Sequence, residues 1–188
     1  MNMLILKENA DLLTEVGRRI VGATVHRVDY RQTEFGGLTT PPAGPAHEID
    51  LEVVLTLSTG VVSVSWERED LVEGLAIGWE EMADLEGVVS VFAEECEQWQ
   101  ELVGRPITNV HASWHVSEVD CPESIWSLRL SFGSGLHAVI ALGELDGRGN
   151  PTYHPDSLLL LFDVDVARSY RPSGATSSAW EGESLLTV

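Results

Sequence analysis

The stretches "VGRRI" (residues 16–20) and "VGRPI" (residues 103–107) decide the fold, because each opens a similar succession of segments. Each follows a segment predicted to be helical, "ADLLTE" (residues 10–15) or "ECEQWQEL" (residues 95–102). We interpret the glycine of each stretch as the residue that ends a helix, since glycine favours the left-handed conformation found there. The isoleucine that follows would then start a strand into the core.

Two strands joined by a tight turn follow each of these corners. In the first half they are residues 48–57 and 61–66, and in the second half residues 125–132 and 136–144. Apolar and polar residues alternate in the leading strand of each pair, which is typical of an antiparallel strand with one buried face. Gly60 and Gly135 lie in the turns "STG" and "GSG", where short hairpins need positive φ.

These segments predict an α+β fold in which two similar antiparallel β-meander halves, each preceded by a short helix, pack as one globular unit. Whether the halves form one sheet or two stays open. The predicted divisions are a first αβββ half, an acidic connector with a helix, a second αβββ half with a final strand, and a loosely held tail. Their respective ranges are 1–66, 67–101, 102–170 and 171–188.

The connector, the final strand and the tail each carry a more detailed expectation. An apolar stripe in the connector (Val88 or Val89, Phe92, Cys96, Trp99 and Val103) has helical spacing, although its β-branched start also fits a short strand. The segment "LLLLFDVDVA" (residues 158–167) predicts one strand, with Asp163 and Asp165 on one face. The tail would be loose unless Trp180 and Leu185 dock.

Composition limits the compartment and the partners. The net charge is −19 with a single lysine, so nucleic acid and anionic membranes are disfavoured partners, whereas a basic protein would be attracted. No basic leader or long apolar segment is visible, and the chain has only two cysteines, so we expect a cytoplasmic protein with reduced thiols. The preference for arginine over lysine suggests a GC-rich, bacterial coding sequence.

No catalytic constellation emerges from the motifs. His111 and His115 with Cys121 have zinc-ligand chemistry, but an i, i+4 spacing on a strand separates the two rings by roughly 13 Å at the usual strand rise. Ser134 near His137 lacks the strand-to-helix turn of a nucleophile elbow. We expect no enzyme, metal or cofactor, and keep a second-choice ligand site formed by His111, His115, Asp146, His154 and Asp156.

The acidic residues are concentrated in the connector. Residues 67–101 contain 12 acidic residues and one basic residue, Arg68. Such a field suits a basic partner, and a tryptophan at its edge is a favoured interface anchor. The predicted partner-binding residues are Trp79, Glu80, Glu81, Asp84, Glu86, Glu94, Glu95, Glu97 and Glu101.

The acidic α+β chain, the "GRxI" corners and "WSLRLSFGSG" (residues 126–135) resemble the small acidic immunity proteins of bacterial polymorphic-toxin systems. The resemblance implies an inhibitor that binds and occludes a toxin domain, such as a basic nuclease. One alternative is a small-molecule-binding or hydrolytic domain with a cleft between the halves. Another is a self-associating structural protein, so that the chain would be a monomer or a homodimer.

Overall fold

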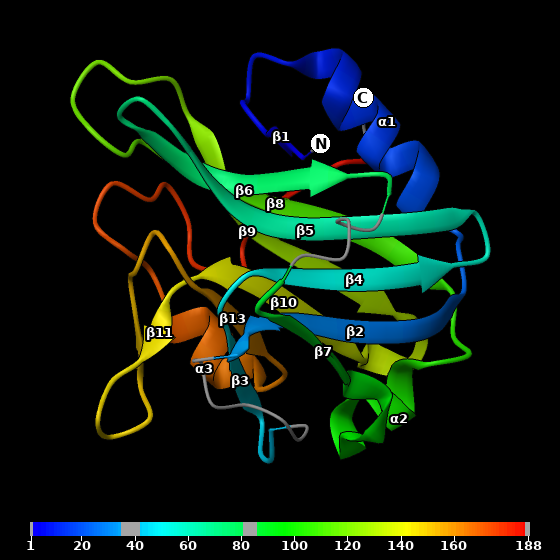
Figure 1. The fold of residues 1–188 in the computed structure, drawn as a ribbon. Coiled ribbons are helices and arrows are strands. Elements are labelled where there is room, and N and C mark those ends of the chain that lie inside the picture. Colours follow the sequence, from blue (N-terminus) through cyan, green and yellow to red (C-terminus); the bar gives the residue numbers. More distant parts are fainter. Residues whose placement is uncertain (1, 35–41, 81–85, 187–188) are drawn as a thin grey trace.

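The computed structural model describes residues 2–34, 42–80 and 86–186. Two six-stranded antiparallel sheets lie face to face, one in front of the other in Figure 1. The first sheet has the spatial order β1 (Met3–Leu4), β6 (Val72–Gly78), β5 (Gly60–Glu69), β4 (Glu52–Leu57), β2 (Val25–Thr33) and β7 (Val88–Phe92). The second has the order β14 (Glu183–Ser184), β8 (Ile107–His115), β9 (Ser124–Phe132), β10 (His137–Leu142), β13 (Leu158–Leu161) and β3 (Ala46–Ile49).

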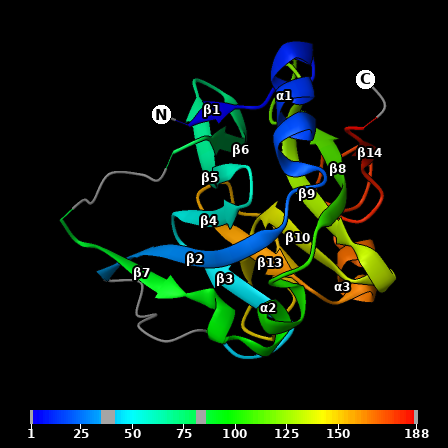
Figure 2. The same ribbon diagram turned by 90° about the vertical axis from the view of Figure 1, so that its right-hand side faces the viewer.

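The described residues also form a small ribbon and three α-helices. The ribbon pairs β11 (Glu144–Leu145) with β12 (Pro151–Thr152). In Figure 2, α1 (Ala10–Ile20) lies at the top between the two sheets and α2 (Glu97–Leu102) lies at the bottom, so the helices close opposite sides of the sandwich. The third helix, α3 (Val164–Ser169), follows β13 directly. None of the helices among the described residues is long and apolar enough to cross a membrane.

The predicted repetition of the two halves is confirmed, and it extends to four strands in each half. β2, β4, β5 and β6 form one meander, and β8, β9, β10 and β13 form the other, each with neighbours in chain order. One further strand lies at each edge of each meander, β1 and β7 in the first sheet and β14 and β3 in the second, so that each sheet has six strands. The two halves form two sheets rather than one, which the alternation of residues did not decide.

The two corners pair with each other about an approximate twofold axis. Gly22 donates its amide hydrogen to the Ile107 carbonyl at 2.7 Å, and Gly104 donates in the same way to Val25 at 2.7 Å. Both glycines have a left-handed backbone, with φ of 83° and 85°, and each lies just beyond the C-cap of its helix. We call Gly22 and Gly104 the corner glycines, and they show that the true equivalents are "IVGATV" (residues 20–25) and "LVGRPI" (residues 102–107).

The predicted role of Gly17 is therefore wrong. Gly17 lies inside α1, which continues to Ile20, and it is buried against the C-terminal segment. The alignment of the two "VG" dipeptides was misleading because the sequence similarity is offset from the structural repeat. Gly104 does follow the end of its helix, as predicted.

A shared irregularity supports the corrected alignment. β2 has a β-bulge between Val25 and Arg27, and β8 has one between Ile107 and Asn109. Both bulges lie at the same distance from their corner glycine. A bulge inserts one extra residue and is rarely placed by chance, so the two halves have the same local design.

The predicted strand at residues 48–57 is divided between the two sheets. β3 ends at Ile49 and pairs with β13 of the second sheet, whereas β4 begins at Glu52 and belongs to the first. Asp50 anchors the crossing point, since its carbonyl accepts a 2.6 Å hydrogen bond from Nε1 of Trp66. Alternation continues through the break, which is why the sequence resembles one strand.

The connector is mostly extended rather than helical. Its β-branched segment forms β7, which was the open alternative, and α2 begins only at Glu97. Cys96 and Trp99 are buried as the stripe predicted, but Phe92 is exposed and lies under the guanidinium of Arg27, 4.5 Å from its ring centroid.

The segment after β13 also differs from the prediction. Asp163 is the N-cap of α3 and accepts hydrogen bonds from the amides of Asp165 and Val166, so the two carboxylates do not share a strand face. The tail is docked, because Leu185 is buried and its amide donates to Val110, while Trp180 packs against the core.

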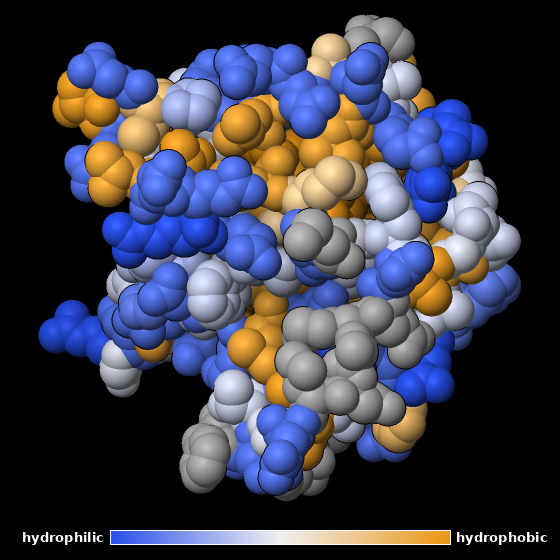
Figure 3. Space-filling model, turned by 45° about the horizontal axis from the view of Figure 1, so that its top comes forward, coloured by the Kyte–Doolittle hydropathy of each residue, from blue (hydrophilic) through white to orange (hydrophobic). Residues whose placement is uncertain are grey.

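Hydrophilic residues cover most of the face drawn in Figure 3, and an apolar area lies among them near β1 and α1. Met3, in the edge strand β1, is 43% exposed. The edge strands β1 and β14 have two residues each, whereas the opposite edges, β7 and β3, have five and four residues, so any pairing with another chain would depend on β7 or β3.

Candidate functional site: an acidic groove beside α2

A groove of about 330 Å³ lies between α2, the β9–β10 hairpin and the start of α3. Its apolar lining comes from Leu102, Leu136 and Phe162, and carboxylates border it. Its lining residues are Pro45, Glu97, Gln98, Glu101, Leu102, Gly135, Leu136, His137, Phe162 and Asp163.

Local structure explains why three carboxylates meet at this groove. Glu97 and Glu101 are four residues apart in α2, so they lie on the same face of the helix. Asp163 is held in place because one of its oxygens, Oδ1, caps α3. Asp163 and the two glutamates line the same groove.

The groove carboxylates have no counter-ion within the part of the chain that the structure describes. None of the ion pairs among residues 2–34, 42–80 and 86–186 includes Glu97, Glu101 or Asp163. Arg105 is close, but its Nε donates to the backbone carbonyl of Glu101 rather than to the carboxylate. An uncompensated acidic groove with apolar walls has the chemistry to hold a cationic side chain.

The other predicted partner-binding residues are spread over the surface. Glu94 serves the fold, because its carboxylate accepts a hydrogen bond from the Val28 amide at 3.1 Å. Trp79 lies beside α1, covered by the guanidinium of Arg19. Three exposed acids, Glu80, Glu86 and Glu95, do not line the groove, and Glu81 and Asp84 lie outside the described residues.

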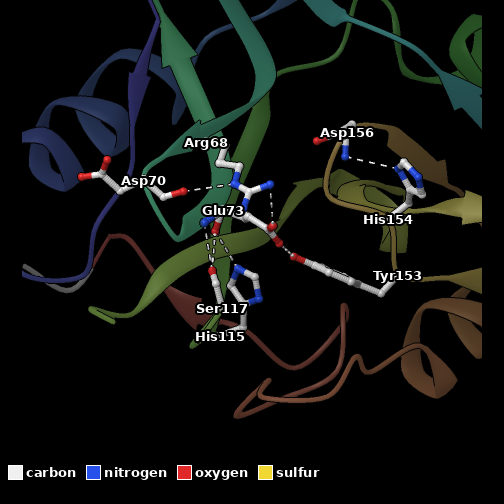
Figure 4. Close-up of polar contacts among 8 residues, drawn as sticks. All are labelled: Arg68, Asp70, Glu73, His115, Ser117, Tyr153, His154 and Asp156. Atoms are coloured by element: carbon white, nitrogen blue, oxygen red, sulfur yellow. Dashed lines mark hydrogen bonds and ion pairs between the residues drawn. The ribbon is translucent and has the colours of Figure 1, made fainter. Parts of the chain in front are cut away.

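Part of the second-choice ligand site gathers around Glu73 on β6, as Figure 4 shows. Nε2 of His115 donates a 2.9 Å hydrogen bond to the Glu73 carbonyl, and the hydroxyl groups of Ser117 and Ser124 donate to the same oxygen. The Glu73 amide in turn donates to Ser117 Oγ. These bonds join β6 of the first sheet to β8 and β9 of the second.

The Glu73 carboxylate is also occupied. The hydroxyl of Tyr153 donates to it at 2.8 Å, and Arg68 lies 3.9 Å away on the other oxygen. Burial and the adjacent carboxylate raise the pKa of Tyr153, while burial lowers the pKa of His115. The Glu73 carbonyl, amide and carboxylate all have partners within the fold, so the cluster is suited to holding the sheets together.

The remaining second-choice residues do not converge. His154 and Asp156 form a local turn, in which the Asp156 amide donates to Nδ1 of His154 (Figure 4). Asp146 closes the β11–β12 turn by accepting from the amides of Arg148 and Asn150, and these bonds lower its pKa. His111 pairs across β8–β9 with Arg129.

The described residues contain no cluster of three or more histidine, cysteine or acidic side chains that could hold a metal ion.

Sequence reasoning missed Asp163, Phe162 and His137 as groove residues. The motif "DVDVARS" (residues 163–169) does carry a helix-start signal, with aspartate at the N-cap, a second acid in the first turn and arginine near the end. That signal was obscured by the apolar run before it. Phe162 and His137 are brought to the groove only by the sheet register.

Comparisons of the chain with models of protein families, with curated proteins and with solved structures give no match.

Proposed function

We propose that this protein is an acidic binding module that takes a basic protein partner, in the manner of the immunity proteins that occlude a toxin domain. The observation that carries the proposal is the groove beside α2, where Glu97, Glu101 and Asp163 border an apolar floor without counter-ions among the described residues. A partner's basic side chain would supply the missing charge, and its aliphatic stem would cover the apolar lining.

The charge of the whole protein supports this proposal. With 30 acidic and 11 basic residues, its field attracts a basic partner from beyond contact distance and accelerates encounter. The groove then offers one specific position for a basic side chain, whereas a uniformly acidic surface would not.

The alternatives have weaker support. A ligand-binding or hydrolytic site would need free polar groups, yet the carbonyl, amide and carboxylate of Glu73 are engaged within the fold. Self-association through sheet edges would depend on β7 and β3, because the other edge strands, β1 and β14, have only two residues each.

The test is to co-purify the protein with the products of genes adjacent to its own and to measure binding by calorimetry. We expect one basic product to bind, with an affinity that falls more than about tenfold between about 50 and about 500 mM salt. Co-expression should also relieve any toxicity of that product. An affinity that ignores salt would contradict the proposal.

Charge-reversed variants locate the interface. The double variant Glu97→Lys with Glu101→Lys should weaken binding by more than about tenfold, because it converts two attractions into repulsions. The matched control reverses Glu86 and Glu95, which are exposed in the same connector but do not line the groove. Equal losses in both variants would mean that net charge alone, rather than the groove, determines binding.

A further inference from the structure

The register of the two sheets identifies the counterpart of the groove in the first half of the chain. We count residues along the strands from the shared bulges. Val28, Leu55 and Val62, which lie opposite one another on β2, β4 and β5, then correspond to Val110, Leu130 and Ala138 on β8, β9 and β10. The next pairs along, Ser63–Gly78 and Val139–Leu161, are the last between the third and fourth strands of each meander. The residue after each of these pairs therefore occupies the same position in its half.

That position is aromatic in both halves. Trp79 follows Gly78, and Phe162 follows Leu161. An acidic residue comes next in each case, Glu80 or Asp163. The aromatic residue that lines the groove in the second half thus has a direct equivalent beside α1.

The helices correspond in the same way when residues are counted back from the corner glycines. Seven residues before each glycine stands a glutamate, Glu15 in α1 and Glu97 in α2. Three residues before each glycine the halves differ, because α1 has Arg19 where α2 has Glu101.

In the first half, Arg19 occupies this site from within the chain. Its guanidinium carbon lies 4.4 Å from the centroid of the Trp79 ring, and its Nε forms an ion pair with Glu15. Glu15 also accepts from Arg18 at 2.8 Å, and the two arginines lower its pKa to about 2. An aromatic ring and a carboxylate together thus hold one arginine.

In the second half, the ring and the carboxylate are kept but the arginine is missing. Phe162 and Glu97 line the open groove, and Glu101 adds a further negative charge where Arg19 would be. Within the described residues, the ion pairs and cation–π contacts supply no cation to Phe162, Glu97 or Glu101. The first half therefore serves as an internal example of what the second half lacks.

We infer that the groove beside α2 binds an arginine side chain of a partner protein, with the guanidinium over Phe162 and between Glu97 and Glu101. This inference rests on the proposed function and specifies the chemistry of the partner at the groove. Arginine fits better than lysine, because its planar guanidinium stacks on an aromatic ring while its edge donates to carboxylates.

The inference is tested on the isolated protein by NMR titration with N-acetyl-arginine methylamide. We expect millimolar affinity, with the largest shift changes at the amides of Glu97, Glu101 and Phe162, as for a single exposed contact of this kind. The isosteric but neutral citrulline derivative should bind at least about tenfold more weakly. No shift change in the groove, or equal binding of the two probes, would overturn the inference.

A variant that copies the first half gives a second readout. Glu101→Arg places an arginine four residues after Glu97, as Arg19 follows Glu15, so it should abolish probe binding and raise the melting temperature. Glu95→Arg makes the same change of charge outside the groove and should leave probe binding within about twofold. Probe binding that survives Glu101→Arg would also overturn the inference.

The two proposals can fail separately. If the arginine probe does not bind but the basic gene product binds with salt dependence, the groove assignment fails and the proposed function stands. If the probe binds in the groove but no basic product binds, the proposed function fails and the arginine site stands.

Discussion

The hydroxyl of Tyr30 donates a 2.7 Å hydrogen bond to Nδ1 of His47. This bond joins β2 of the first sheet to β3, which comes from the first half of the chain but belongs to the second sheet. The direction follows from the neighbours: Nε1 of Trp99 donates to the same hydroxyl oxygen, and the ring proton of His47 is on Nε2, so Nδ1 accepts the hydroxyl proton. Nε2 of His47 then donates to the Gly44 carbonyl at 3.0 Å. A chain of buried hydrogen bonds thus connects β2, β3 and α2.

Removing the Tyr30 hydroxyl should be costly. Tyr30→Phe leaves the Trp99 N–H and His47 Nδ1 without a partner, and each unsatisfied buried group costs about 1–3 kcal/mol. We expect the free energy of unfolding, measured with urea, to fall by about 2–6 kcal/mol at unchanged m-value. As a control, Thr14→Val removes a hydroxyl from the exposed face of α1 and should change stability by less than about 0.5 kcal/mol. A similar small loss for Tyr30→Phe would contradict the buried network.

Stability should rise with pH through the range in which histidines titrate. Burial lowers the pKa of His47, His111 and His115 below 6.5 in the folded protein. Just below pH 6.5 the unfolded chain therefore binds more protons than the folded one, so acid favours unfolding. The stability that these three neutral histidines contribute is fully present above their pKa in the unfolded chain, and it is lost as the pH falls through their pKa values in the folded protein.

The measurement is the urea midpoint at intervals between about pH 5 and about pH 7.5, a window above the range where most carboxylates titrate. The midpoint should increase with pH, and His47→Gln should reduce that slope. His26→Gln, a replacement at an exposed position of β2, is the control and should leave the slope as it is. A flat profile for the unmodified protein would refute the expectation.

The α+β class and the repetition of the halves follow from local patterns that sequence reveals directly. Alternation in residues 125–132, for example, reports one buried face, because side chains on a strand point to opposite sides. Division of residues 48–57 between two sheets depends instead on tertiary contacts at Asp50, which leave no periodic trace. Local patterns therefore recover the class but not the assignment of strands to sheets.

The candidate site was predictable only in part, for a related reason. Charge density is a local property of the sequence, and it predicts Glu97 and Glu101. Phe162 and Asp163 reach the groove through the register of β13 with β10, and that register is set by packing across the whole sheet. The sequence favours Trp79 as an interface anchor, but Arg19, distant in sequence, covers its ring.

Gly17 gives a sharp test of how the C-terminal tail is held. A Cβ at this position would lie 2.9 Å from the carbonyl oxygen of Leu185, too close for the tail to stay in place. Helix propensity alone would make alanine more stable than glycine here by about 1 kcal/mol. The sign of the change in stability therefore shows whether helix propensity or the clash with Leu185 dominates. We expect Gly17→Ala to be destabilising, because the contact is with backbone and cannot be relieved by a rotamer change.

The readouts are the urea midpoint and hydrogen exchange of the Leu185 amide, which donates to Val110 in the intact protein. In Gly17→Ala the midpoint should fall, and exchange at Leu185 should accelerate by more than about tenfold because the β14–β8 pairing is loosened. Gly133→Ala is the matched control, since an added Cβ there meets no atom within 4 Å. A Gly17→Ala protein that is more stable and equally protected at Leu185 would show that the tail adapts to the added methyl group and does not depend on this close approach.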